Sequence, residues 1–118
     1  MRHSLAAMKK GKPAPFFLLG HPVGHSLSPA MHNAAFKALG LRAHYALLDV
    51  EPGDVPRALA RLRAENCGGA NVTIPHKEAA YHYLAAKHAL SDGAKTLHAV
   101  NTVVFRPDGT LFGDNTDA

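Results

Sequence analysis

The sequence predicts an α/β domain in which helices cover both faces of a mixed, mainly parallel sheet, giving three α/β/α layers. Two observations lead to this fold class. From Phe16 onward, short apolar runs alternate with segments of helical periodicity, a pattern typical of strands joined by crossover helices. Near the end of the chain, two apolar segments flank the turn Pro107-Asp108-Gly109, which predicts an antiparallel hairpin.

Length and composition fit one globular domain. The chain has 118 residues, enough to bury a core, and 47% of them are hydrophobic. No apolar run approaches the roughly 20 residues that a membrane-spanning helix needs. The single cysteine, Cys67, excludes an internal disulfide and suits a reducing compartment. We therefore expect a cytoplasmic protein without a membrane partner.

The positive charge of the chain is concentrated at its start. The net charge is +4 and the isoelectric point about 9.5, values that invite a nucleic-acid-binding interpretation. However, the first twelve residues contain no acidic residue and carry Arg2, Lys9, Lys10 and Lys12. Without these four, nine basic residues stand against nine acidic ones. We expect residues 1–14 to be a flexible basic tail, residues 15–118 to form the domain, and nucleic acid not to be a partner.

The first strand and helix have clear boundaries in the sequence. Phe16-Phe17-Leu18-Leu19 is an apolar run that ends at Gly20, which predicts a buried strand. Ser28-Pro29 has the form of a helix start, and Gly40 is a helix stop. Periodicity predicts that this helix packs through one apolar face, made of Met31, Ala34, Ala35, Ala38 and Leu39.

The next elements continue the alternation. Residues 44–50 read as a second strand, and Gly53 or Asp54 opens a second helix. The inward side chains of this helix are expected to be Val55, Leu59 and Leu62, with Arg57, Arg61 and Arg63 in water. Gly68-Gly69 then leads into a third strand.

The stretch from Asn71 to Lys77 carries the first indication of chemistry. Asn71 and Thr73 are two positions apart, so on a strand they point to the same face. Pro75 ends the strand because it lacks an N–H for the ladder. Lys77 then falls in the first turn of the following helix, where the helix dipole disfavours a positive charge. The alternative interpretation is a solvent-facing helix lysine.

Two serines precede the first helix. Ser26 and Ser28 lie close to its N-terminus, where hydroxyls and the helix dipole can hold a carboxylate. The simpler interpretation is that Ser28 only caps the helix and Ser26 is a loop hydroxyl.

Two further polar clusters have a structural alternative. Asn101-Thr102 is a common turn between short strands, and Asn115-Thr116-Asp117 is a common helix cap. The nine histidines form no metal-binding pattern: His21 and His25 are separated by Pro22 and Gly24, so helical register does not bring them together. No metal is expected.

Taken together, four motifs resemble the shikimate dehydrogenases in their order and spacing. They are Gly20-His21-Pro22-Val23-Gly24-His25-Ser26-Leu27-Ser28-Pro29, Asn71-Val72-Thr73-Ile74-Pro75-His76-Lys77-Glu78, Ala99-Val100-Asn101-Thr102 and Gly113-Asp114-Asn115-Thr116-Asp117. The resemblance covers residues 16–118 and is to the amino-terminal, substrate-binding domain. Family members continue into a Rossmann domain that binds NADP, and this chain has no GxGxxG pattern after a strand.

The resemblance implies both a reaction and roles for the motif residues. The family reduces 3-dehydroshikimate to shikimate with NADPH, in the pathway to chorismate and the aromatic amino acids. It implies that Ser26 and Ser28 hold the substrate carboxylate, and that Lys77 and Asp117 form the catalytic pair. Ring hydroxyls are assigned to Thr73, Asn101 and Asp117, with Asn71 close by. The cofactor half is expected to be missing, which would leave the isolated chain inactive.

Several alternatives stay open. The chain could belong to a quinate/shikimate dehydrogenase paralogue, could be a stand-alone binding module for a hydroxylated carboxylate, or could use Lys77 to form a Schiff base. The choice between NADP and NAD is also open, as is a homodimer through the strand edge at 103–112. Two positions depart from many relatives: His98 replaces glycine, and Asp114 replaces a tyrosine or another neutral residue.

Overall fold

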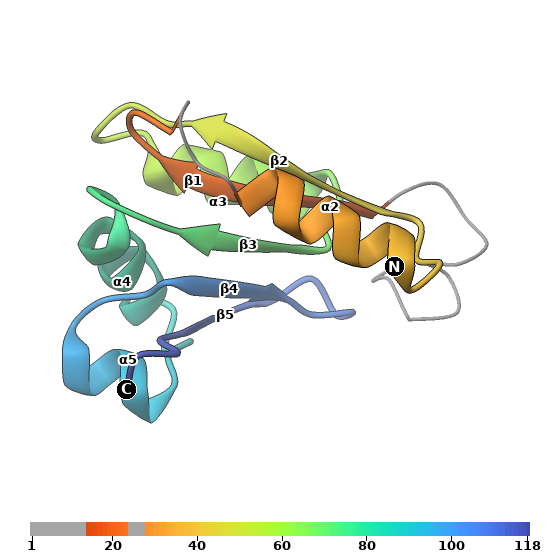
Figure 1. The fold of residues 1–118 in the computed structure, drawn as a ribbon. Coiled ribbons are helices and arrows are strands. Elements are labelled where there is room, and N and C mark those ends of the chain that lie inside the picture. The colour runs from red at the N-terminus through yellow and green to blue at the C-terminus, as the bar shows by residue number, and fades with distance from the viewer. Residues whose placement is uncertain (1–13, 24–27) are drawn as a thin grey trace.

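The computed structural model describes residues 14–23 and 28–118 (Figure 1). The strands are β1 (Ala14–Gly20), β2 (Ala43–Asp49), β3 (Gly69–Val72), β4 (Thr102–Phe105) and β5 (Leu111–Asp114). The helices are α2 (Ser28–Ala38), α3 (Val55–Ala64), α4 (Lys77–Ala85) and α5 (Asp92–Leu97). The predicted order of strand and helix up to α4 is confirmed. In the described part of the chain, no helix is long and apolar enough to cross a membrane.

All five strands form one sheet in the order β2-β1-β3-β4-β5. β1 pairs in parallel with both β2 and β3, whereas β4 runs antiparallel to β3 and to β5. Four of the five strands therefore run in the same direction and β4 runs in the opposite one, so the sheet is mixed and mainly parallel, as predicted. The expected hairpin joins β4 to β5, and Gly109 in its turn has φ +87°, in the region that glycine tolerates best.

The helices lie on both sides of the sheet, so the predicted three layers are confirmed. α2 lies across β1 and β2 on one face, and α3 lies on the other (Figure 1). Adjacent phenylalanines show the two faces: Phe16 contacts the ring of Phe36 in α2, whereas Phe17 packs against the main core. That core lies between the sheet and α3, α4 and α5, and its fully buried members include Leu19, Val55, Leu59, Ala80, Leu84, Ala94 and Val100.

The predicted packing face of α2 is wrong. Met31 and Leu39 are 70% and 65% exposed, and Ala34, Ala35 and Ala38 are exposed as well. The helix instead turns Asn33 and Phe36 toward the sheet. The side-chain amide of Asn33 accepts from the backbone N–H of Tyr45 at 2.7 Å and donates to its carbonyl at 2.9 Å. The hydrogen bonds of Asn33 with the backbone of β2, rather than the apolar periodicity of α2, therefore determine which side of the helix faces the sheet.

The other helices differ in how far the sequence predicted them. α3 follows the prediction: Val55, Leu59 and Leu62 are buried. The short helix α5 was not predicted. It begins after Ser91, whose hydroxyl accepts from the N–H of Ala94 at 3.1 Å. α5 lies beside β5, because Gly113 exchanges backbone hydrogen bonds with Ala89 and Ser91.

Candidate active site

Five of the predicted site residues lie at one edge of the sheet. Asn71 is in β3, Thr73 follows its end, and Lys77 is the first residue of α4. Asn101 immediately precedes β4, which runs in the opposite direction, and Asp117 follows β5, which is parallel to β3. The carboxyl ends of β3 and β5 and the start of β4 therefore meet. Ligand sites of open α/β sheets form at this edge.

Asn71 lies at the centre of a hydrogen-bonded row of side chains. Its Oδ1 accepts from the Tyr45 hydroxyl at 3.0 Å, and its Nδ2 lies 3.4 Å from the Thr102 hydroxyl and 3.5 Å from the Asn101 carbonyl. Tyr45 is 4% exposed, and its ring stacks on that of His32 with the ring centroids 4.3 Å apart. Burial raises the pKa of Tyr45, which keeps its hydroxyl protonated and able to donate.

Asn101 connects β4 with the end of the chain. Its Oδ1 accepts from the backbone N–H of Thr116 at 3.1 Å and from the Thr102 hydroxyl at 3.0 Å. Its Nδ2 donates to the Thr116 hydroxyl at 2.9 Å. Each Nδ2 group has two N–H bonds. One of them therefore remains for a ligand after the Thr116 contact.

The segment that carries Asp117 is held by a buried amide. Asn115 is 6% exposed, and its Nδ2 donates to the Ala99 carbonyl at 3.1 Å. Its Oδ1 accepts from the backbone N–H of Asp117 at 2.9 Å. Asn115 thus ties the backbone of Asp117 to the segment that leads into Asn101. The Asp117 side chain itself is exposed.

Lys77 opens α4, as the sequence predicted, and is partly exposed. Its carbonyl accepts from the N–H of Val100 at 3.0 Å, which attaches the start of the helix to the segment before Asn101. Lys77 and Asp117 lie at the same edge of the sheet, and no ion pair between their side chains is among those of the described residues.

The structure describes one of the two serines that are predicted to bind a carboxylate. Ser28 is the first residue of α2, in agreement with the predicted helix start. Ser26 lies outside the described residues.

A histidine contacts the end of β2 at the same edge of the sheet. His21 follows β1, and its Nδ1 lies 2.6 Å from an Asp49 carboxylate oxygen. Its Nε2 lies 3.8 Å from Glu51. The hydrogen bond to Asp49 raises the pKa of His21, with smaller contributions from the charges of Asp49 and Glu51. Among the described residues, no group of three or more His, Cys, Asp or Glu side chains could hold a metal ion.

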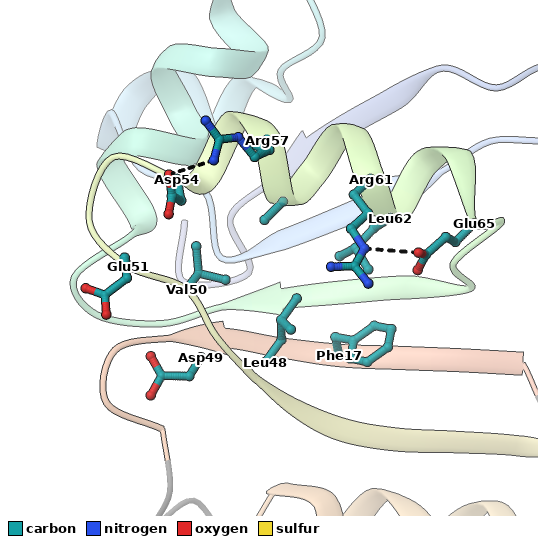
Figure 2. A pocket seen from close by; sticks show the side chains of 11 residues that line it. Phe17, Leu48, Asp49, Val50, Glu51, Asp54, Arg57, Arg61, Leu62 and Glu65 are labelled. Atoms are coloured by element: carbon teal, nitrogen blue, oxygen red, sulfur yellow. Dashed lines mark hydrogen bonds and ion pairs between the residues drawn. The ribbon is translucent and has the colours of Figure 1, made fainter.

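A separate groove opens on the face of the sheet that α3 covers. It has a volume of about 360 Å³ and lies between α3 and strands β1 and β2 (Figure 2). Phe17, Leu48 and Leu62 give it an apolar floor, while Arg57 and Arg61 on its rim pair with Asp54 and Glu65. None of the predicted site residues lines this groove.

Of the two positions at which the sequence was expected to depart from many relatives, His98 and Asp114, the first has a left-handed backbone. His98 ends α5 with φ +52°, in the left-handed region where glycine is unstrained. Its ring lies 5.3 Å from that of Tyr81. The Asp114 carboxylate accepts from the N–H of Asn115 at 2.8 Å and so belongs to the turn that leads to Asp117.

One contributing residue was missed by sequence reasoning. Tyr45 lies in the middle of β2 and reads as an ordinary strand residue. No local pattern connects it with Asn71, because the contact joins residues on two strands that are separated by β1.

Fold and site together define the class of this protein, an α/β domain with a hydrogen-bonded polar cluster at the carboxyl edge of its sheet. Comparison with known proteins then specifies the family. The sequence model of the shikimate dehydrogenase substrate binding domain matches residues 18–103. The chain belongs to this family.

The relatives agree with this assignment. The chain is 55% identical over 100 residues to a shikimate dehydrogenase (NADP(+)) of Moorella thermoacetica, covering 85% of this chain and 32% of that protein. A crystal structure of a Thermus thermophilus shikimate 5-dehydrogenase in complex with NADP(H) and shikimate has a TM-score of 0.76 and 44% identity, covering 89% of this chain and 38% of that one.

A third comparison shows that a reductase with a different named substrate has a similar fold. The ligand-free structure of a 5-ketofructose reductase from Gluconobacter has a TM-score of 0.79 and 29% identity, and the match covers 90% of this chain and 37% of that one. The chain spans about a third of the length of the curated relatives it matches.

Proposed function

We propose that this chain is the substrate-binding half of a shikimate dehydrogenase, which reduces 3-dehydroshikimate to shikimate with NADPH. The observation that carries the proposal is the meeting of the three described motifs, around Asn71, Asn101 and Asp117, at the carboxyl edge. They are joined by the hydrogen bonds of Asn71, Asn101 and Asn115. Such a row of amides and hydroxyls suits a ligand with several ring hydroxyls.

The site residues divide into binding and proton transfer. Thr73 and Asn101 offer a hydroxyl and a free N–H to ring hydroxyls, with Asn71 beside them. Ser26 and Ser28 are proposed for the carboxylate, and Ser28 is the first residue of α2. The nicotinamide cofactor supplies the hydride when it is bound, and no residue of this chain is assigned to it.

Lys77 and Asp117 form the proposed catalytic pair. As the ketone oxygen becomes an alcohol, the Lys77 ammonium donates the required proton and its charge stabilises the developing alkoxide. In the oxidation direction the Lys77 amine accepts that proton. Asp117 holds a ring hydroxyl, and its negative charge orients the Lys77 ammonium.

Binding can be tested on the 118-residue chain itself. Titration of the ¹⁵N-labelled chain with shikimate should shift the side-chain amides of Asn71 and Asn101 and the backbone amide of Thr73, with weak affinity. Thr73→Val should reduce these shifts, whereas Thr96→Val, on the exposed face of α5, should not. Shifts confined to other surfaces would contradict the proposal.

The same titration separates related functions. Quinate and 5-ketofructose serve as competing ligands, the latter because a 5-ketofructose reductase shares this fold. Preference for either one would change the assigned substrate but not the site. The isolated chain should show no NADPH-dependent reduction of 3-dehydroshikimate, and such activity would contradict the claim that it is only the substrate-binding half. Borohydride should trap no adduct at Lys77, and a trapped adduct would favour the Schiff-base alternative.

A further inference from the structure

One buried residue next to the proposed proton donor has no role in binding or proton transfer. His76 precedes Lys77 and is 1% exposed. Apart from the hydroxyl of the buried Tyr45, the buried polar or charged side chains of the described residues are those of His76 and Asn115. An imidazole removed from water in this way destabilises the fold unless its polar atoms find partners.

The His76 imidazole has a specific partner on a distant strand. Its Nε2 is hydrogen-bonded to the carbonyl of Val50, the residue after β2. A carbonyl only accepts, so Nε2 carries the proton in this bond. In the sheet β1 lies between β2 and β3, so the imidazole reaches past the end of β1 to join the turn after β3 with the end of β2.

This arrangement departs from the usual chemistry of a helix start. His76 occupies the N-cap position of α4, where a Ser, Thr, Asp or Asn side chain would bond the first N–H groups of the helix. The His76 side chain makes no capping bond. Its backbone still forms the turn, because its N–H donates to the Thr73 carbonyl at 2.9 Å and its carbonyl accepts from Ala80 at 3.0 Å.

The surrounding backbone is fixed at both sides of Lys77. On one side, the Val50 N–H donates to the Gly20 carbonyl at 3.0 Å, so the partner of His76 is itself attached to β1. On the other side, the Lys77 carbonyl accepts from Val100 at 3.0 Å. Only the His76 side chain connects the first turn of α4 to the β2 side of the sheet among the hydrogen bonds of the described residues.

We propose that His76 is a positioning residue for Lys77: its buried imidazole, bonded to the Val50 carbonyl, fixes the point from which the Lys77 side chain reaches the substrate. This inference rests on the proposed role of Lys77 as proton donor. Positioning acts on the reacting geometry more than on substrate binding, because the groups proposed to bind the substrate are the Thr73 hydroxyl and the Asn101 amide rather than the His76 imidazole.

The test uses the enzyme in which this domain is joined to its nicotinamide-binding domain. His76→Phe fills the same space without an N–H and should lower kcat about 10- to 100-fold, while KM for shikimate stays within about threefold. His76→Gln places an amide N–H near the position of Nε2 and should restore most of kcat. His82→Phe, the same substitution at an exposed site of α4, should leave kcat unchanged.

If His76→Phe does not fold, His76→Asn replaces it, because its amide is too short to reach Val50 and makes a matched pair with His76→Gln. Unchanged kcat in the folded variant, an equal change of kcat and KM, or no recovery with glutamine would overturn the positioning role. Failure of the proposed function is a separate result, since it would appear as a wild-type enzyme that does not oxidise shikimate.

Discussion

The N–H of Val100 donates to the carbonyl of Lys77 at 3.0 Å, and this bond joins two motifs that are more than twenty positions apart in the sequence. It attaches the first residue of α4 to the segment that leads into Asn101. The backbone of the proposed proton donor is therefore bonded directly to the segment that leads into Asn101, a residue proposed to bind the substrate. A shift of α4 would move both groups together.

Replacing Lys77 tests the proton-transfer role. In the complete enzyme, Lys77→Ala should lower kcat by about 10² to 10⁴, the range of general acid–base catalysis, and change KM for shikimate far less. Lys95→Ala, on the exposed surface of α5, is the matched control and should behave as wild type. Steady-state kinetics in the oxidation direction give both constants. Normal turnover, or equal losses in turnover and affinity, would remove Lys77 from the chemistry.

Gly20 lies where two loops approach closely. A Cβ at this position would lie 2.4 Å from Cγ1 of Val23 and 2.6 Å from Cγ2 of Thr73. Gly20→Ala should therefore lower the free energy of unfolding by about 1–3 kcal/mol, as overpacking does, and weaken shikimate binding through Thr73. Urea unfolding and the shikimate titration measure the two effects. A fully stable variant with normal affinity would show that this contact relaxes easily.

The left-handed backbone of His98 predicts a stabilising substitution. His98→Gly should raise the free energy of unfolding by about 1 kcal/mol, because glycine adopts this conformation without the Cβ clash. Loss of the Tyr81 ring contact offsets part of the gain. His82→Gly, inside α4, should instead lower stability by about 1 kcal/mol. Urea denaturation curves of both variants supply the comparison, and the same sign in both would refute the backbone explanation.

The pair of His21 and Asp49 predicts a pH dependence of stability. The pKa of His21 is raised in the folded protein, mainly by its hydrogen bond to Asp49. The stabilising contribution is therefore fully present below the ordinary value of 6.5 and is lost as the pH rises through the higher folded value. Asp49→Asn should destabilise the domain more at about pH 6 than at about pH 9.

A second aspartate provides the control for this measurement. Hydrogen bonds from the hydroxyl and N–H of Thr110 lower the pKa of Asp108. Its contribution is present above its ordinary value of 3.8 and is lost only as the pH falls through the lower folded value. Asp108→Asn should therefore have the same effect on urea unfolding at both pH values. A pH-independent effect of Asp49→Asn would contradict the assignment of the His21 shift.

Sequence reasoning reached the layer order, the hairpin and the position of Lys77 because these depend on local signals. Gly20 marks the end of β1 and Gly69 the start of β3, whereas β3 ends at Val72, before the Pro75 at which the strand was expected to stop. The Val55-Leu59-Leu62 spacing marks the buried face of α3. The rotation of α2 was out of reach because it depends on the backbone of Tyr45, which lies twelve positions from Asn33. Likewise, the bonds of Tyr45 to Asn71 and of His76 to Val50 cross the sheet, and periodicity carries no information about them.

The two bonds of Asn33 to the backbone of Tyr45 also determine what the outer side of β2 can accept. β2 is the last strand on its side of the sheet, and a terminal strand offers free backbone groups to any extended chain. At Tyr45 those groups are already occupied by a side chain that imitates a neighbouring strand. A foreign strand would have to displace both bonds at Tyr45, the third residue of β2. Asn33 therefore occupies the outer backbone groups of β2 at Tyr45, which opposes the pairing of another strand at this point.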